Sequence, residues 1–206
     1  MTNFWVSPKV AFSDEDDAFK SLKKQVLHFD EVEPGIYRSG LISEEAAPFL
    51  KTLGIKTVVN FDDDAKRAKK EEESLKLFGI HTAPLPWCGW IKPPPNRIEK
   101  TLALLEDQEL RPILIHCKHG QERTGVAIAC WRISHDGWPA DRAYQEMKAY
   151  GFRAFWYGHL KKYVYHFAKT HGDQKAKMTN PFEQAKISVL SFFYWFMKFK
   201  HPSSVF

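Results

Sequence analysis

A cysteine and an arginine stand six positions apart in a polar loop, where they could attack and hold a phosphoryl group. The segment runs from His116 to Gly125 and reads HCKHGQERTG. A thiolate at Cys117 is favoured where backbone N–H groups converge at the N-terminus of a helix, and the same groups bind phosphate. The guanidinium of Arg123 can hydrogen-bond two phosphoryl oxygens at once, a task that lysine does poorly. The pattern therefore predicts a phosphate-binding loop with Cys117 as nucleophile.

The sequence on either side of this loop predicts the strand and the helix that position it. Residues 112–116 (PILIH) form an apolar run typical of a buried strand, and residues 123–135 form an almost wholly apolar helix. Thr124, in the first turn of that helix, could donate its hydroxyl to the Cys117 sulfur and later help the thiol leave. A strand, a tight turn at Gly120 and a helix N-terminus together build a phosphate cradle.

The rest of the chain alternates predicted strands with predicted helices. The expected strands cover residues 27–40 with an internal turn, 55–61, 80–87 and 112–116, and the expected helices cover 43–53, 65–78, 97–109, 123–135, 140–149 and 155–170. This alternation is typical of an α/β fold, with a central, mainly parallel sheet flanked by helices. We expect a single domain at residues 31–172, an N-terminal extension at 1–30 and a C-terminal extension at 173–206.

Composition and charge narrow the class of protein. The chain has 206 residues, of which 44% are hydrophobic and 27% charged, as in a soluble globular domain. Its net charge of +5 favours anionic partners. Because the Cys117 loop suits a phosphoryl group, we expect a phosphorylated small molecule or a phosphoprotein and no nucleic acid. Three scattered cysteines and no visible signal peptide lead us to expect a reducing, cytoplasmic location.

The loop and its surroundings resemble the protein tyrosine phosphatase superfamily. The pattern C-x5-R-T-G between an apolar strand and an apolar helix is similar to its signature, while residues 35–40 (GIYRSG) and 58–61 (VVNF) resemble its compact dual-specificity and inositol-phosphate branches. The resemblance covers residues 32–150. It implies a phosphatase with a phosphatase-like fold, a phosphocysteine intermediate at Cys117, a transition state bound by Arg123, and neither metal nor cofactor.

The resemblance also implies which further residues contact the substrate. The pocket would be lined by the residues between the nucleophile and the arginine, namely Lys118, His119, Gly120, Gln121 and Glu122. Two alternatives remain open. The cysteine and the arginine could share this spacing by chance, or the chain could be an inactive member of the family that only binds phosphate.

One expected residue is missing from the pattern. Relatives place an aspartate that protonates the leaving oxygen on the loop before the helix that leads to the nucleophile strand. Here that loop covers residues 86–95, and residues 74–97 contain neither aspartate nor glutamate. Three explanations stay open: a substitute among Asp62, Asp63 and Asp64 at the end of the 55–61 strand, an acid within the loop itself at Glu122 or His119, or a leaving group that needs little protonation.

Basic residues favour a substrate with several phosphates. Lys118 and His119 make the loop itself basic, and further cations could lie near its mouth, namely Arg38, Lys66, Arg67 and Lys92. Several cations around one pocket favour an inositol polyphosphate over phosphotyrosine. Each of these residues could instead be an ordinary solvated charge. The alternative activity is that of a protein tyrosine or dual-specificity phosphatase.

Four other features have open interpretations. Trp87 and Trp90 could line the pocket or pack inside the protein. Cys88 could form a protective disulfide with Cys117 or be an unremarkable thiol, whereas Cys130 belongs in the core. The aromatic run 187–197 is shorter than the roughly 20 residues that a spanning helix needs. We expect it to pack on the protein, with self-association and interfacial membrane contact as alternatives.

Overall fold

The computed structural model describes residues 11–178, and the expected role of residues 187–197 lies outside that range. Five short strands form one sheet in the order β1-β2-β5-β3-β4, with the bounds β1 Asp30–Glu33, β2 Ile36–Ser39, β3 Thr57–Asn60, β4 His81–Pro84 and β5 Ile113–His116. β1 pairs with β2 as an antiparallel hairpin, and the other three pairings are parallel. The strand β5 lies at the centre, so the loop that follows it emerges in the middle of the sheet edge.

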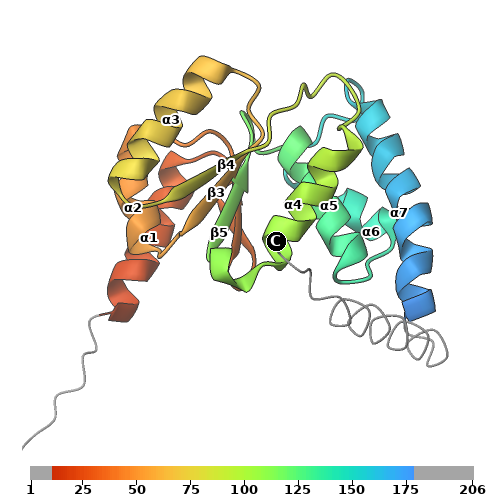
Figure 1. Cartoon of the computed structure of the whole chain (residues 1–206), viewed down its shortest axis with the longest axis horizontal. Coiled ribbons are helices and arrows are strands. Elements are labelled where there is room, and N and C mark those ends of the chain that lie inside the picture. Colours follow the sequence, from red (N-terminus) through yellow and green to blue (C-terminus); the bar gives the residue numbers. More distant parts are fainter. Residues whose placement is uncertain (1–10, 179–206) are drawn as a thin grey trace, which may run out of the picture.

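Helices cover both faces of the sheet. On one side lie α1 (Ala11–Gln25), α2 (Ala47–Thr52) and α3 (Ala65–Leu77), and on the other lie α4 (Pro95–Glu106), α5 (Glu122–Ser134), α6 (Ala140–Ala149) and α7 (Gly158–Met178). Figure 1 shows the two groups of helices on either side of the strands. Short 3₁₀ turns at Glu44–Ala46 and Gln108–Leu110 precede α2 and β5.

Each parallel strand contributes to two cores because its side chains alternate between the faces. Val58 and Leu114 belong to the cluster beneath α1, α2 and α3, whereas Val59 and Ile115 belong to the cluster beneath the other four helices. All four are fully buried. The apolar runs of β3 and β5 therefore reflect burial on both faces, which is typical of parallel strands.

The α/β fold with a mainly parallel sheet is confirmed, and the structure differs from expectation at three places. The helix α1 was not predicted, although Leu22 in the helix and Val26 just after it are 0% and 3% exposed in the core. The described part of the expected N-terminal extension therefore packs on the domain. The strand β4 ends at Pro84 instead of residue 87. Leu85 N still donates to Asn60 O at 2.9 Å, but Pro86 has no N–H with which to continue the pairing. The helix α7 continues to Met178.

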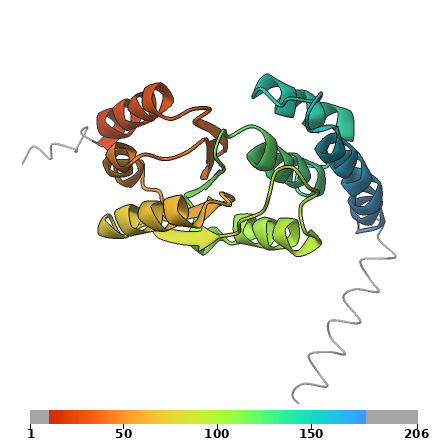
Figure 2. The ribbon, with the colours of Figure 1, turned by 90° about the horizontal axis from the view of Figure 1, so that it is seen from above.

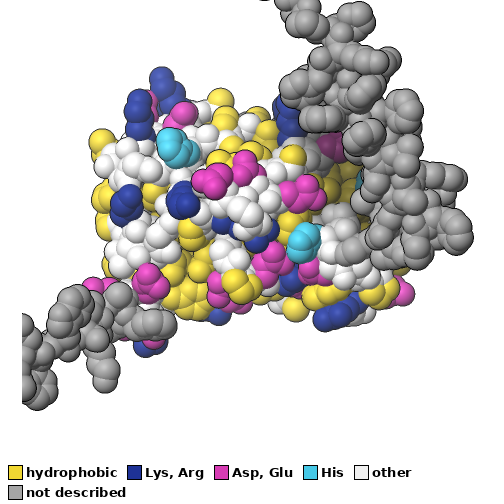
Figure 3. Space-filling model, turned by 60° about the horizontal axis from the view of Figure 1, so that its bottom comes forward, with side chains coloured by type: hydrophobic (Ala, Val, Ile, Leu, Met, Phe, Trp, Pro, Cys, Tyr) yellow, Lys and Arg dark blue, Asp and Glu magenta, His cyan; other side chains and the backbone are white. Residues whose placement is uncertain are grey.

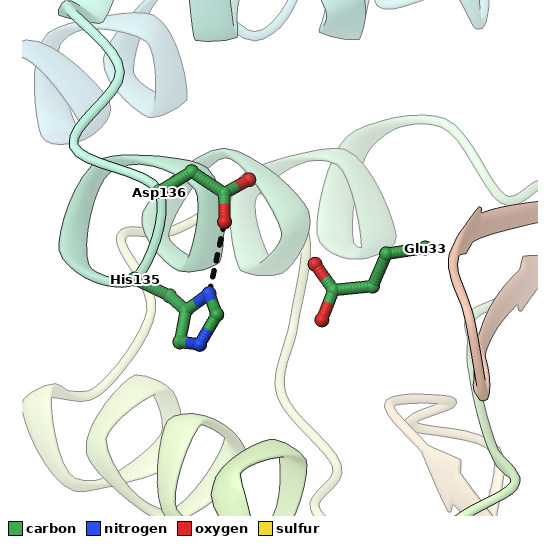
Figure 4. Close-up of side chains that lie close together, drawn as sticks. All are labelled: Glu33, His135 and Asp136. Carbon is green, nitrogen blue, oxygen red and sulfur yellow. Dashed lines mark hydrogen bonds and ion pairs between the residues drawn. The ribbon is translucent and has the colours of Figure 1, made fainter.

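The end of the molecule away from the Cys117 loop carries acidic and basic side chains interspersed with apolar ones (Figure 3). In the described part of the chain, Glu33, His135 and Asp136 are the one group whose ligand atoms lie close enough to share a metal ion. Figure 4 shows Asp136 bonded to His135, and Arg132 Nη1 lies 2.9 Å from Asp136 and 3.7 Å from Glu33. Since Arg132 pairs with both carboxylates and Arg111 also pairs with Glu33, we assign no metal to this group.

Among residues 11–178, the structure contains no helix that is both long enough and apolar enough to span a bilayer.

Candidate active site

The Cys117 loop joins the carboxyl end of β5 to the N-terminus of α5. Ligands in open α/β sheets bind at this edge, and the first N–H groups of a helix are free to meet an anion. Cys117 is only 2% exposed, and Thr124 is fully buried. The hydroxyl of Thr124 has no hydrogen-bond partner among residues 11–178, so it can donate to a sulfur or a phosphoryl oxygen.

Gly120 allows the loop to press against the end of β2. Its φ of +69° lies in the region that favours glycine, and a Cβ there would stand 2.7 Å from Gly40 N and from Ser39 C. No side chain could be accommodated without moving the backbone. Leu41 N donates to Lys118 O at 3.2 Å beside this contact. The loop is therefore fixed against the segment that follows β2.

The loop carbonyls are satisfied from outside the pocket. His119 O accepts a hydrogen bond from His28 Nδ1 at 2.8 Å, which requires the proton on that nitrogen, and Gly120 O accepts one from Arg38 Nη2 at 2.8 Å. Lys118 O is satisfied in the same way by the backbone of Leu41. Because these carbonyls face outward, the N–H groups of the loop can face a phosphate.

The side chain of Arg123 is held by acceptors from two other segments. Its Nη1 donates to Phe61 O at 2.7 Å, to Asp63 Oδ1 at 2.7 Å and to Trp87 O at 3.1 Å. Arg123 is 8% exposed, so its guanidinium is placed by the ends of β3 and β4 and not by solvent. This arrangement fixes the fork that would hold two phosphoryl oxygens.

Of the three candidate acids after β3, two have other partners. Asp62 is buried and accepts hydrogen bonds from Arg67 Nε and, at 3.0 Å, from Arg67 Nη2. Burial alone would raise its pKa, but these bonds and the charges of Arg67 and Arg123 outweigh it and lower the pKa below the ordinary value. Asp64 caps α3 by accepting from Arg67 N at 3.0 Å. Asp62 Oδ1 also lies 3.7 Å from Arg123 Nη2, but its bonds to Arg67 lower its pKa. The exposed Asp63, 2.7 Å from Arg123 Nη1, is therefore the better placed candidate acid of the three.

The two candidate acids within the loop are also poorly placed for proton donation. Glu122 is 5% exposed and accepts a hydrogen bond from Arg153 Nε at 2.7 Å. Burial lowers the pKa of His119, and the nearby charges of Arg153, Lys118 and Arg123 lower it further against the effect of Glu122. A histidine with a lowered pKa is mostly neutral near pH 7, which weakens its role as an acid.

A buried polar network supports the loop from the α3 side. Glu71 Oε1 lies 2.9 Å from His116 Nε2 and accepts a hydrogen bond from Asn60 Nδ2 at 2.8 Å. Asn60 Oδ1 in turn accepts from Asp62 N at 2.6 Å. Glu71, on α3, therefore links the residue before the nucleophile to the turn that carries the acidic triplet. The sequence shows Glu71 only as one charge on a charged helix.

The carboxylate-free loop between β4 and α4 lies across Arg123. A Cβ on Gly89 would stand 3.6 Å from Arg123 Cγ, and Gly89 O lies 3.3 Å from His159 Nε2. Trp90 stacks on Tyr157 with ring centroids 4.8 Å apart. Figure 2 shows this loop arching over the helix end toward α7. The segment before α7 thus anchors a cover over the site.

The tryptophans and the cysteine of this covering loop differ in their exposure to solvent. Trp87 is 4% exposed and belongs to the core, whereas Trp90 is 62% exposed and packs on the outer side of the loop. Cys88 is half-buried, and both Cys88 and Cys117 are free thiols in the structure. Cys130 is fully buried, as expected.

The residues predicted to contact the substrate differ in their exposure and in their partners. Lys118, Lys66 and Lys92 are exposed, and Gln121 is half-buried. Arg67, expected near the mouth, is paired with Asp62 and Asp64 instead. Arg38 is 1% exposed behind the loop, a position that favours support of the loop over contact with substrate. Sequence reasoning missed the supporting residues, namely His28, Asn60, Glu71, Tyr150 and Arg153.

Gly120 provides a test of the loop geometry, with Gly54 as a matched control. We expect Gly120→Ala to weaken binding of tungstate, a phosphate-like oxyanion, by about tenfold or more, because both the positive φ and the contact with Gly40 resist a side chain. Gly54 has a φ of +76° but no atom within 4 Å of the added Cβ. Gly54→Ala should lower stability by about 1 kcal/mol and leave affinity unchanged. Equal affinities for the two variants, measured by calorimetry, would contradict this account.

Comparison with known proteins agrees with this geometry. The dual-specificity phosphatase TpbA of Pseudomonas aeruginosa is 31% identical over 125 residues, which cover 58% of this chain and 52% of TpbA. Inositol diphosphatase DSP3 of Arabidopsis thaliana is 34% identical over 111 residues, 51% of this chain and 53% of that protein. The chain thus spans about half the length of these curated relatives.

A solved structure and a family model extend the comparison. The catalytic core of the S. cerevisiae PP-IP phosphatase Siw14 matches with a TM-score of 0.59 and 26% identity, covering 67% of this chain and 84% of that one. The family model described as "Tyrosine phosphatase family" matches residues 25–184, which include the whole sheet and the Cys117 loop. Because this match covers more than half of the sequence, the chain belongs to the tyrosine phosphatase family.

Proposed function

We propose that this chain is a cysteine-dependent phosphatase that cleaves highly anionic inositol polyphosphates, with an inositol diphosphate as the favoured substrate. The Cys117 thiolate attacks phosphorus and the leaving group departs, so that a phosphocysteine forms. Arg123 holds the equatorial oxygens, and the Thr124 hydroxyl helps the thiolate to leave when water attacks. The observation that carries the proposal is the set of hydrogen bonds and ion pairs made by the carboxylates around Arg123.

Three of the carboxylates near Arg123 have partners that leave them poorly placed to donate a proton. Asp62 is held ionised by Arg67, Asp64 caps α3, and Glu122 is paired with Arg153. Asp63 is paired with Arg123 itself at 2.7 Å. A phosphoanhydride is cleaved with a phosphate as leaving group, which departs as an anion and needs little protonation. The site therefore suits the terminal phosphate of a diphosphate better than a simple ester.

Charge and kinship support the same substrate class. Lys118, in the loop, is exposed and can meet a second phosphate, and Lys92 is exposed on the covering loop. Among the relatives, inositol diphosphatases of Arabidopsis and rice match about half of this chain at 30–34% identity. Because Cys117 is 2% exposed, substrate entry requires the covering loop and Asp63 to move away from Arg123.

A second candidate is a dual-specificity protein phosphatase, which the similarity to TpbA favours. A module that only binds phosphate is the third candidate. An intact nucleophile and arginine, placed together at the helix N-terminus, argue against a binder because binding alone needs no thiolate.

A comparison of substrates tests the proposal. We expect kcat/KM for an inositol diphosphate to exceed that for a phosphotyrosine peptide by roughly tenfold or more, and Cys117→Ser to reduce phosphate release to background on both. Cys130→Ser, a change in the buried core, is the matched control and should keep activity. A preference for the peptide would favour the second candidate, and no release by the wild-type protein from any substrate would favour the binding module.

Asp63 can be tested as an acid for poor leaving groups. We expect Asp63→Asn to slow hydrolysis of an alkyl phosphate by about a hundredfold, the usual contribution of a general acid, and to change hydrolysis of the diphosphate much less. Asp64→Asn is the matched control, because asparagine also caps helices and should preserve both rates. Unchanged alkyl phosphate hydrolysis in Asp63→Asn would remove Asp63 as the acid. Equal losses on both substrates would assign it to holding Arg123.

A further inference from the structure

Arg38 is a buried guanidinium directly behind the phosphate-binding loop. It lies on β2, is 1% exposed and ranks among the largest fully buried side chains. Its Nη2 donates to Gly120 O at 2.8 Å, while its Nε and Nη1 are buried without a hydrogen-bond partner. A guanidinium buried in this way is costly unless an opposite charge compensates it.

The partner that compensates Arg38 is not a carboxylate. Within residues 11–178, no carboxylate lies within 4.0 Å of it, whereas Arg132 forms ion pairs with Glu33, Asp136 and Glu146. The Arg38 guanidinium instead lies 3.5 Å from the ring centre of Tyr150. The Tyr150 hydroxyl donates to Asp30 at 2.9 Å, and Asp30 also accepts from Lys23 at 3.0 Å. The hydrogen bond from Tyr150 to Asp30 holds the Tyr150 ring against the Arg38 guanidinium, which keeps its positive charge.

The pairing of β2 with β5 places Arg38 near Cys117, because Arg38 lies opposite Ile115 and Ser39 lies opposite His116, the residue before Cys117. Burial lowers the pKa of Arg38 to about 10, and the charges of Tyr150, Glu146, Cys117 and Asp30 oppose that lowering. Arg38 therefore stays charged near pH 7. A positive charge held this close behind the loop favours a negative charge at the centre of the loop.

We propose that Arg38 is a positioning residue that stabilises the Cys117 thiolate from behind the loop, opposite to Arg123. This inference rests on the proposed cysteine-dependent function. It assigns two tasks to one side chain: Nη2 holds the Gly120 carbonyl outward, and the unpaired charge favours the ionised sulfur. Arg123 serves the phosphoryl group on the open side, so the two arginines are not interchangeable.

The other titratable and charged groups near Cys117 and Arg38 come from every neighbouring element: Asp30 on β1, Asp62 and Asp63 after β3, Glu71 on α3, His116 on β5, Lys118 and His119 in the loop, Glu122 and Arg123 on α5, Glu146 on α6, Tyr150 after α6, and Arg153 and Tyr157 before α7. Several of these are paired with one another, as in Asp63–Arg123, Glu71–His116 and Glu122–Arg153. Arg38 differs from these groups because it combines a positive charge, full burial and the lack of a carboxylate partner within residues 11–178.

The test is the pH dependence of Cys117 alkylation by iodoacetamide, measured on the Cys117 peptide by mass spectrometry in the full chain. Arg38→Gln removes the charge, and we expect the midpoint of the profile to rise by about one pH unit. Arg38→Lys keeps the charge and should stay within about a third of a unit of wild type. Arg132→Gln, a control at a half-buried arginine away from the site, should leave the midpoint unchanged.

Circular dichroism establishes that each variant is folded. If Arg38→Gln does not fold, Arg38→Met, which also lacks the charge, carries the same expectation. A folded, uncharged variant with the wild-type midpoint, or equal shifts in the Arg38 and Arg132 variants, would overturn the inference. Alkylation needs no substrate, so failure to hydrolyse an inositol diphosphate would overturn the proposed function without touching this result. Conversely, identical alkylation profiles for the Arg38 variants and the wild type would overturn the role of Arg38 and leave the proposed phosphatase activity standing.

Discussion

The structure depends on one requirement: the backbone of the Cys117 loop must turn its N–H groups inward, so its carbonyls must be satisfied outside. Three residues from other segments meet this requirement. Leu41 N, His28 Nδ1 and Arg38 Nη2 donate to the carbonyls of consecutive loop residues, at 3.2, 2.8 and 2.8 Å. An unsatisfied buried carbonyl would cost about 1–3 kcal/mol. The glycine at position 120 permits the close approach that brings these donors within reach.

Local sequence patterns were enough to predict the central part of the site. Cys117, Arg123 and Thr124 lie on one continuous strand, loop and helix, so their spacing in the chain determines their spacing in space. The apolar runs predicted the parallel strands because burial on both faces requires them. The helix α1 could also have been found, since Ala18, Leu22 and Val26 recur every four residues along one buried face.

The supporting residues could not be predicted because their partners are distant in sequence. Arg38 and Gly120 are 82 positions apart, and Glu71 and His116 are 45 apart. In the sequence, Glu71 is one charge on a charged helix, and Arg38 was expected at the mouth of the pocket and not behind the loop. Arg67 was expected at the pocket mouth for the same reason. Its backbone N–H instead caps onto Asp64, and its guanidinium pairs with the buried Asp62, so both bonds hold it at the start of α3.

The two sides of Cys117 therefore have different chemistry. Behind it lie buried groups that fix the loop, and in front lie Arg123, Asp63 and a removable cover. Asp63 occupies a donor of Arg123 that a phosphoryl oxygen would otherwise take, so a substrate must compete with a carboxylate for that donor. A substrate with several negative charges, attracted by exposed cations such as Lys118, is well suited to win this competition.

The central claim is that Cys117 itself carries the phosphoryl group during turnover. Acid quenching of the wild-type protein within one turnover of an inositol diphosphate, followed by peptide mass spectrometry, tests it most directly. The account predicts one phosphoryl group on the Cys117 peptide, and none in an Arg123→Met variant treated in the same way. Phosphate release with the phosphoryl group on another residue, or on none at any quench time, would contradict it.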